Sequence, residues 1–239
     1  MPIAPKWLFD TLEFLTPKLP LIEVVETVSL SKSVKRICFK GDLKNVQFTV
    51  GSFIDFRIND TEARRYTVSH ADTEKGLFEF VVYLNGKGCG SRLMADLKVG
   101  DQIVMYKPRA LSRYYDKTTQ RFVIFGDETS LALACSFLPV LKKNKHQFMF
   151  IFELEEENKD VPKLLGLENC LIFSKNFLSN KQEWVGKLPV IDTPDWQEAK
   201  FVLTGNAKSA QLFRKIIREN TNGTVYLHGY WLAGKRDYK

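Results

Sequence analysis

The segment Arg64-Arg65-Tyr66-Thr67-Val68-Ser69, followed about twenty residues later by Gly88-Cys89-Gly90-Ser91, decides the fold of this chain. The first segment offers a guanidinium, an aromatic ring and a hydroxyl at alternate positions, which an extended strand lays along one elongated ligand. The second places small residues before an apolar, helix-like stretch, an arrangement that presents free N–H groups to a phosphate. Together the two segments indicate a dinucleotide with a planar ring system and favour a flavin.

The sequence around these two segments has the texture of a β-domain. Short runs rich in Val, Ile, Phe, Tyr and Thr are separated by turn residues. The expected strands are 21–30, 34–40, 52–58, 64–69, 77–84 and 102–107, with one helix at 91–97. Six short strands with a single helix between them predict an antiparallel barrel or sandwich.

Beyond residue 118 the pattern changes to strands that alternate with helices. We expect strands at 122–125, 147–154, 170–173, 201–204 and 224–227, with helices at 129–141 and 207–219. This alternation is typical of a parallel, doubly wound sheet. The polar stretch 112–120 would hold the boundary, so we predict two domains, residues 1–117 and 118–239.

Composition excludes several classes of protein. The 239 residues are 44% hydrophobic and 26% charged, as in ordinary globular proteins. The net charge is +7 and the pI about 9.1, but the basic residues are scattered and form no stripe. We therefore expect a mild preference for small anionic ligands and no nucleic-acid partner.

Cysteine usage and the chain start bear on the compartment. The four cysteines lie far apart and there are only three histidines, so no metal site is expected. Isolated cysteines fit a reducing compartment, and the first residues lack the apolar core of a signal peptide. The most apolar stretch, 122–141, is interrupted by Asp127 and Glu128 and predicts no membrane span. A cytoplasmic protein is expected.

Taken in order along the chain, five motifs resemble one family. They are Arg64-Arg65-Tyr66-Thr67, Gly88-Cys89-Gly90-Ser91, Val99-Gly100-Asp101, Asp127-Glu128-Thr129 and Tyr230-Trp231. Their order and spacing resemble the ferredoxin–NADP⁺ reductase superfamily and, within it, the siderophore-interacting proteins, which are FAD-dependent ferric-siderophore reductases. The resemblance implies an FAD-binding β-barrel followed by an α/β domain like that of NAD(P)H reductases.

The resemblance also implies roles for individual residues. Tyr66 would pack on the flavin ring and Arg64 would neutralise the pyrophosphate, which the fork of a guanidinium suits. The implied cofactor-binding set is Arg64, Tyr66, Thr67, Val68, Ser69, Gly88, Cys89, Gly90, Ser91 and Trp231, with Cys89 as a small filler. Trp231 has two open interpretations, a cover for the flavin or an anchor for the last strand.

A second nucleotide site is expected at the crevice of the α/β domain. Its candidate residues, for NAD(P)H, are Asp127, Glu128, Thr129, Thr204 and Gly205. The two adjacent carboxylates would repel phosphate, so a helix N-cap by Asp127 or Thr129 is an equal interpretation. The family often has Gly-Glu where this chain has Gly205-Asn206. NAD(P)H or reduced ferredoxin is therefore expected as electron donor.

The expected reaction is electron transfer from the flavin, which needs no catalytic side chain. The substrate would be a ferric siderophore or another ferric chelate, bound by Lys107, Arg109, Lys235 and Arg236, although a solvated surface is the default for such residues. The main rival is a general ferredoxin- or flavin-type NAD(P)H reductase that does not act on siderophores. A decayed, non-catalytic binding module and a nucleic-acid-binding barrel are more distant alternatives.

Overall fold

The computed structural model describes residues 5–7, 10–11, 21–86, 88–180 and 185–232. It divides into two compact units, Met1–Leu111 and Ser112–Lys239, whereas the sequence analysis sets the division between 117 and 118. Each unit is described by itself below.

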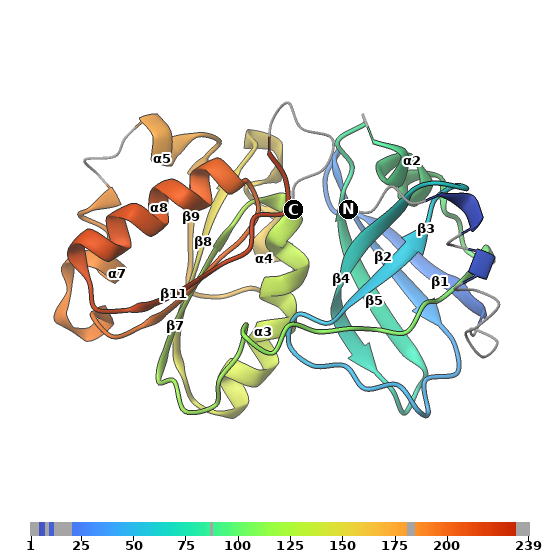
Figure 1. The fold of residues 1–239 in the computed structure, drawn as a ribbon, viewed down its shortest axis with the longest axis horizontal. Helices are drawn as coiled ribbons and strands as arrows, with labels where there is room; N and C mark the ends of the chain where they lie inside the picture. The colour runs from blue at the N-terminus through green and yellow to red at the C-terminus, as the bar shows by residue number, and fades with distance from the viewer. Residues whose placement is uncertain (1–4, 8–9, 12–20, 87, 181–184, 233–239) are drawn as a thin grey trace. The chain divides into compact units, whose positions relative to one another are not determined.

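The first unit is an antiparallel six-stranded sheet that curls into a nearly closed barrel (Figure 1). Its strands are β1 (Leu21–Ser29), β2 (Val34–Lys40), β3 (Phe53–Arg57), β4 (Ala63–Asp72), β5 (Leu77–Tyr83) and β6 (Gln102–Val104), in the order β3-β4-β5-β2-β1-β6. Each expected strand is present, and the antiparallel barrel predicted from the sequence is confirmed.

Large aromatic side chains fill the barrel. Phe39, Phe56, Phe78 and Phe80 are almost wholly buried and their rings stack or meet edge to face. The edge strands β3 and β6 do not pair; Phe53 instead makes an isolated antiparallel bridge with Arg109. A cavity of about 360 Å³ lies at this opening, lined by residues of β3, β6 and the segments after them. The barrel is therefore not closed by hydrogen bonds between its two edge strands, β3 and β6.

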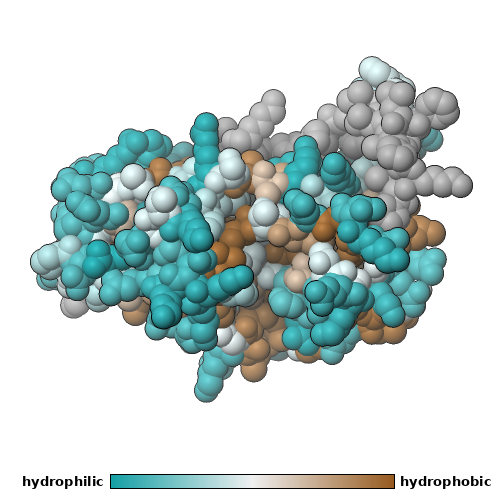
Figure 2. Space-filling view, turned by 90° about the horizontal axis from the view of Figure 1, so that it is seen from below, coloured by the Kyte–Doolittle hydropathy of each residue, from teal (hydrophilic) through white to brown (hydrophobic). Residues whose placement is uncertain are grey.

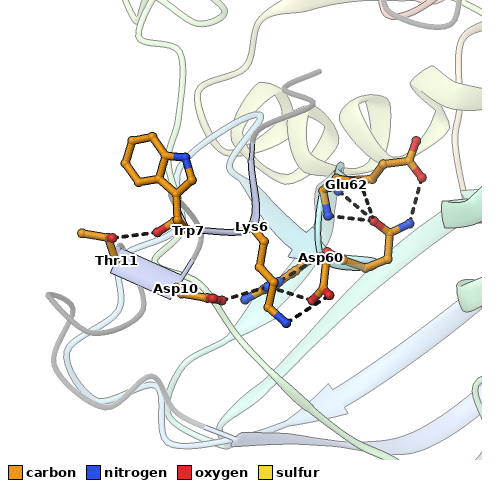
Figure 3. A network of polar contacts seen from close by, with 9 residues as sticks. Lys6, Trp7, Asp10, Thr11, Asp60 and Glu62 are labelled. Carbon is orange, nitrogen blue, oxygen red and sulfur yellow. Dashed lines mark hydrogen bonds and ion pairs between the residues drawn. The ribbon is translucent and has the colours of Figure 1, made fainter.

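Two described pieces near the N-terminus bind at the end of β3 (Figure 3). The Lys6 ammonium lies 3.2 Å from the Asp60 carboxylate, and Arg57 donates to Asp10 over 3.0 Å. All four side chains are partly or largely exposed, so each pair contributes little to stability.

Helix α2 (Cys89–Asp96) of the barrel unit is held at its C-terminal end by a lysine from β2. Lys35 is nearly buried, and its ammonium donates to the carbonyls of Met94, Ala95 and Leu97 at 2.7–3.2 Å. A cation at a helix C-terminus satisfies carbonyls that lack helical partners. Met94 and Leu97 pack into the core from the same turn. By holding the C-terminal end of α2, Lys35 helps to orient the N-terminal end of the helix, which begins at Cys89.

The second unit is a parallel five-stranded sheet in the order β11-β10-β7-β8-β9. The strands are β7 (Arg121–Gly126), β8 (Gln147–Leu154), β9 (Cys170–Ser174), β10 (Lys200–Leu203) and β11 (Thr224–Leu227). Figure 1 shows helices on both faces, with α3 (Leu131–Lys143) and α4 (Val161–Leu164) opposite α5 (Phe177–Asn180), α7 (Pro189–Asp192) and α8 (Ala207–Asn220). The doubly wound fold is confirmed.

Apolar runs explain this sheet, because a strand covered on both faces reads as a continuous hydrophobic segment. Phe122 to Phe125 and Phe201 to Leu203 are almost wholly buried. Short elements that the sequence analysis did not predict, α4, α5, α7 and the 3₁₀ turns η2 (Glu156–Asn158) and η3 (Pro194–Trp196), lie in the long connections. They are too brief to carry a helical repeat in the sequence.

On the face shown in Figure 2, polar residues cover much of the surface, with apolar side chains in patches between them. Large exposed apolar side chains among the described residues include Trp7, Leu21, Val99, Val104 and Leu164. No helix in the described ranges has the length and apolar character that crossing a bilayer requires.

Candidate functional site

Strand β4 presents its two arginines on opposite faces. In the register with β3, Arg64 lies opposite Phe56, Tyr66 opposite Ile54 and Arg65 opposite Asp55. Arg65 donates to Asp55 over 2.9 Å and its guanidinium lies 3.8 Å from the centre of the Phe53 ring. Of the two, only Arg64 therefore shares a face with Tyr66, as the R-x-Y alternation predicts.

Gly90 brings the two sequence motifs into contact. A Cβ placed on Gly90 would lie 2.6 Å from the Tyr66 hydroxyl and 2.7 Å from Cγ of Arg64. Real side chains do not approach so closely, so only glycine allows α2 to start this near to β4. The aromatic ring, the guanidinium and the helix start therefore form one constellation, called here the Arg64–Tyr66–Gly90 corner.

The first backbone amides of α2 lie before the first hydrogen bond of the helix. The first helical hydrogen bond of the turn runs from Arg92 N–H to the Gly88 carbonyl at 3.1 Å, so the amides of residues 89–91 precede it. No acidic residue lies in the first turn, and Gly88 caps the helix without a side-chain bond. The Gly88 N–H itself donates to the Asn85 side chain at 3.3 Å. This end of α2 suits an anion.

Glu62 is a residue of this corner that the sequence analysis missed. Its carboxylate accepts hydrogen bonds from Arg64 at 3.0 Å and from Asn59 at 2.9 Å, and a further one from Cys89. The bonds from Cys89, Asn59 and Arg64 lower the pKa of Glu62 to about 2. Glu62 precedes the motif in a turn that has no periodic pattern, so no sequence signal marked it.

The remaining motif residues divide between the site and the framework. Tyr66 is half-buried against Phe56 and Phe80, and burial raises the pKa of its hydroxyl. Val68 is buried and its N–H donates to the Ser52 carbonyl at 2.8 Å. Ser69 sits in a β-bulge, buried, with its hydroxyl donating to Glu79 at 2.9 Å. Thr67 lies opposite Phe53 on the other face.

Cys89 and Ser91, at the start of α2, are both half-buried. Burial and the hydrogen bond to Glu62 raise the pKa of the Cys89 thiol, which keeps it protonated at neutral pH. The Ser91 hydroxyl accepts from Gly86 N–H at 3.2 Å. Cys89 therefore donates a hydrogen bond to Glu62 from a half-buried position.

The basic residues proposed for the substrate differ in their surroundings. Arg109 pairs closely with Asp55 and its guanidinium lies 5.2 Å from the centre of the Phe53 ring, so much of its charge is balanced. Lys107 is exposed. Lys235 and Arg236 lie outside the described residues.

The crevice of the second unit is filled by its own aspartate. Asp127 is only 3% exposed and accepts hydrogen bonds from the Thr129 N–H and Asn206 N–H at 2.9 Å each, and from the Trp231 indole at 2.7 Å. It is the N-cap of the 3₁₀ turn η1 (Glu128–Ser130), which decides between the two capping residues considered above. Trp231 is thereby held to this unit by its side chain and by a backbone bridge to Asn206.

The neighbours of Asp127 are also internally satisfied. Glu128 is fully buried, pairs closely with Lys175 and accepts from the Glu155 N–H at 2.7 Å. Thr204, also fully buried, donates to the Phe125 carbonyl at 3.0 Å. The five crevice residues named from the sequence are therefore together at one edge of the sheet.

Two further carboxylates approach this edge, and neither was singled out from the sequence. Burial raises the pKa of the Glu153 carboxyl, against the opposing hydrogen bonds from Leu178 N–H and the Ser209 side chain. A cavity of about 180 Å³ is lined by Asp127, Glu153, Glu155, Lys175, Asn176, Asn206, Ser209 and Trp231. The lining is acidic, in contrast to the Arg64–Tyr66–Gly90 corner.

One family model matches part of the first unit. Residues 21–114 match the family model described as the oxidoreductase FAD-binding domain. This match covers both motifs of the corner and supports FAD as the cofactor and an oxidoreductase as the class of protein. A search of curated protein sequences finds no match.

Solved structures share the two-unit fold at low sequence identity. The siderophore-interacting protein SipS from Aeromonas hydrophila has a TM-score of 0.73 and 18% identity, over 91% of this chain and 93% of that chain. A phthalate dioxygenase reductase has a TM-score of 0.74 and 12% identity, over 97% and 72%. An intact type IV self-sufficient cytochrome P450 monooxygenase has 0.69 and 14%, over 88% of this chain and 28% of its own length. The chain thus spans under a third of that monooxygenase.

Proposed function

We propose that this protein is an FAD-dependent reductase that passes electrons to the Fe(III) of a siderophore and so releases Fe(II). The Arg64–Tyr66–Gly90 corner carries the proposal. It joins a guanidinium, an aromatic ring and the start of α2. These groups lie so close together that a Cβ added to Gly90 would collide with the side chains of both Tyr66 and Arg64. A flavin dinucleotide requires a cation for its pyrophosphate and a flat face for its ring.

The residues present fit FAD. Arg64 would hold the pyrophosphate together with the amides of residues 89–91, which precede the first helical bond and face no acidic residue of their own turn. Tyr66 would pack against the ring, since its own ring is already fixed edge-on to Phe80 at 6.2 Å between centroids. The pyrophosphate would replace Glu62 as the partner of Arg64.

FAD supplies the redox chemistry, because it accepts electrons in pairs and releases them singly. The protein's part is to orient the ring and to shield it, and no proton-transferring side chain is required. Each Fe(III) takes one electron and becomes Fe(II), which hard oxygen ligands hold less tightly. Reduction thus loosens the chelate without breaking a covalent bond.

Two observations support a siderophore as the acceptor. The fold matches the siderophore-interacting protein SipS over 91% of this chain and 93% of that chain. The net charge of +7 favours an anionic ferric chelate. NAD(P)H and a reduced ferredoxin are the two candidate donors, and a cytoplasmic location would supply either.

The test has two stages, each with its own decision. The full chain is mixed with FAD and desalted, and a product without flavin absorbance contradicts the proposal at once. The bound flavin is then photoreduced without oxygen and mixed with a ferric hydroxamate, with an Fe(II) trap present. Reoxidation faster than that of free reduced FAD, with stoichiometric Fe(II), is expected. Equal rates would favour the rival, a flavin- or ferredoxin-type reductase that does not act on siderophores.

A further inference from the structure

The sheet order of the second unit locates its ligand crevice. Strands β8 and β9 lie on one side of β7, and β10 and β11 lie on the other. The strand order therefore reverses between β7 and β10, which makes this position the topological switch point of the sheet. Open α/β sheets bind dinucleotides at such a point, at the carboxyl ends of the strands. Asp127 directly follows β7, and Gly205 and Asn206 follow β10. These three residues form the crevice itself.

The crevice donors that a pyrophosphate requires are already used. The Thr129 N–H opens the turn before α3 and donates to Oδ1 of Asp127 at 2.9 Å. The Asn206 N–H stands at the start of α8 and donates to Oδ2 at 2.9 Å. Trp231 Nε1 donates to the same Oδ2 at 2.7 Å, and the Thr129 hydroxyl donates to Oδ1 at 2.5 Å. One carboxylate thus engages both helix starts.

The space is taken as well as the donors. A Cβ on Gly205 would lie 2.7 Å from Cγ of Asp127, so the backbone that approaches closely here packs on the carboxylate. The remaining cavity of about 180 Å³ is smaller than the roughly 300 Å³ at which ligand sites begin. Asp127, Glu153 and Glu155 line it, and its one ammonium, on Lys175, already pairs with Glu128. Phosphate would meet uncompensated negative charge.

We propose that the Asp127 carboxylate is an internal substitute for a cofactor phosphate and denies this crevice to the ADP-ribose half of NAD(P)H. The inference deepens the proposed function and rests on it only for the flavin whose reduction reports on the donor. A reduced nicotinamide then meets the flavin without help from its nucleotide tail. The proposal favours an electron donor that is recognised outside this crevice. A reduced electron-transfer protein is the expected class of donor.

The decisive experiment compares NADH with reduced nicotinamide mononucleotide, which lacks the adenylate. Both are mixed anaerobically with the FAD-loaded full chain, and bleaching of the flavin is followed. The expected rates rise linearly with donor concentration and agree within about threefold, because no binding energy comes from the remote half. Saturation at micromolar NADH, with the mononucleotide at least about thirtyfold slower, would overturn the inference.

Calorimetry with ADP-ribose supplies a readout that needs no flavin reduction. The wild-type chain is expected to give no heat of binding at millimolar ADP-ribose, and Asp127→Ala is expected to gain at least about tenfold in affinity, since two helix amides become free. Glu156→Gln removes an exposed carboxylate that does not line the cavity and is expected to gain nothing. Micromolar binding by the wild type, or an equal gain in both variants, would contradict the role of Asp127.

A folding control and a flavin control keep the outcomes separate. If Asp127→Ala does not fold, Asp127→Asn removes the charge while keeping an oxygen for Thr129, and its ADP-ribose affinity is expected to rise above that of the wild type. An unchanged affinity in that folded variant counts against the inference. A chain that holds no FAD contradicts the proposed function, whereas the ADP-ribose measurement on the same chain still decides about the crevice.

Discussion

The two units contain the same device, a helix start beside the end of a strand, and use it in opposite ways. At the start of α2, the turn has no acidic residue and the neighbouring strand offers Arg64. At the starts of η1 and α8, the amides of Thr129 and Asn206 donate to Asp127, which is 3% exposed. A helix N-terminus therefore suits an anion better where no carboxylate of the chain already accepts from its amides.

The electrostatic surroundings follow the same division. Glu62 at the barrel corner remains partly exposed, at 27% for its side chain, so a phosphate can replace it on Arg64. In the second unit, Asp127 and Glu128 are buried, and Glu128 is held by an ammonium and a backbone amide. Water stabilises the first type of carboxylate when it leaves its partner, but it does not reach the second type.

The largest expected effect breaks the closed side of this comparison. Glu128→Gln replaces a fully buried acceptor of the Lys175 ammonium with an amide that meets it as a second donor. Because one partner of a buried ion pair is lost, the free energy of unfolding should fall by about 3 kcal/mol. Denaturant titration measures it. Glu156→Gln, at an exposed pair with Lys159, should stay within about 0.5 kcal/mol of the wild type.

Arg64→Ala tests the open side. Removal of the guanidinium should lower FAD affinity by about ten- to a hundredfold, because charge-assisted hydrogen bonds contribute about 1.5–3 kcal/mol. Quenching of flavin fluorescence on titration gives the dissociation constant. Arg65→Ala is the matched control, since Arg65 occupies the opposite face and bonds Asp55. If both variants lose FAD equally, the assignment of faces to the ligand is wrong.

Gly90→Ala tests the contact between the two motifs. The added methyl would stand 2.6 Å from the Tyr66 hydroxyl, so α2 must move away from β4. We expect a loss of about 1–3 kcal/mol in unfolding free energy, as for other overpacked sites, and weaker FAD binding. Gly88→Ala is the control, because its Cβ would meet only Asn85 Oδ1, at 3.9 Å. Equal loss of FAD in the two variants would argue against the tight corner.

The smallest effect concerns acid stability at Glu62. Its pKa in the folded chain is about 2, below the ordinary value near 4.5, so folding favours the ionised form. This contribution is complete above about pH 4.5 and is lost as the pH falls through 2. Glu62→Gln should therefore flatten the fall of stability in that window, as unfolding midpoints measured at each pH will reveal. An unchanged profile would mean that Glu62 is not hydrogen-bonded as described.

The element pattern was largely predictable because both domains follow simple hydrophobic periods. The expected strands at 34–40, 147–154 and 224–227 have the observed bounds, and the helix expected at 207–219 extends to Asn220. The helix expected at 91–97 begins instead at Cys89, because the small residues Cys89 and Gly90 are already helical. Short connections such as α7 stayed hidden because four residues make no periodic signal.

The roles of individual side chains were predictable only where the residues concerned lie on the same strand or in the same turn. The alternation R-x-Y places Arg64 and Tyr66 on one face by backbone geometry alone. Lys35 gave no signal, because its role on the carbonyls of α2 depends on contacts about sixty residues away in the chain. Trp231 is likewise defined by a bond to Asp127, 104 residues away.

The sequence by itself determined a barrel followed by a parallel α/β sheet and placed Arg64 and Tyr66 on one face of a strand, because strand and helix periods are local properties. The tertiary structure alone decided that the Thr129 and Asn206 amides donate to Asp127. That depends on where a carboxylate from one loop comes to rest against the turn of another, as Asp127 does against Gly205 and Asn206. Long-range packing sets that contact, and no local pattern encodes it.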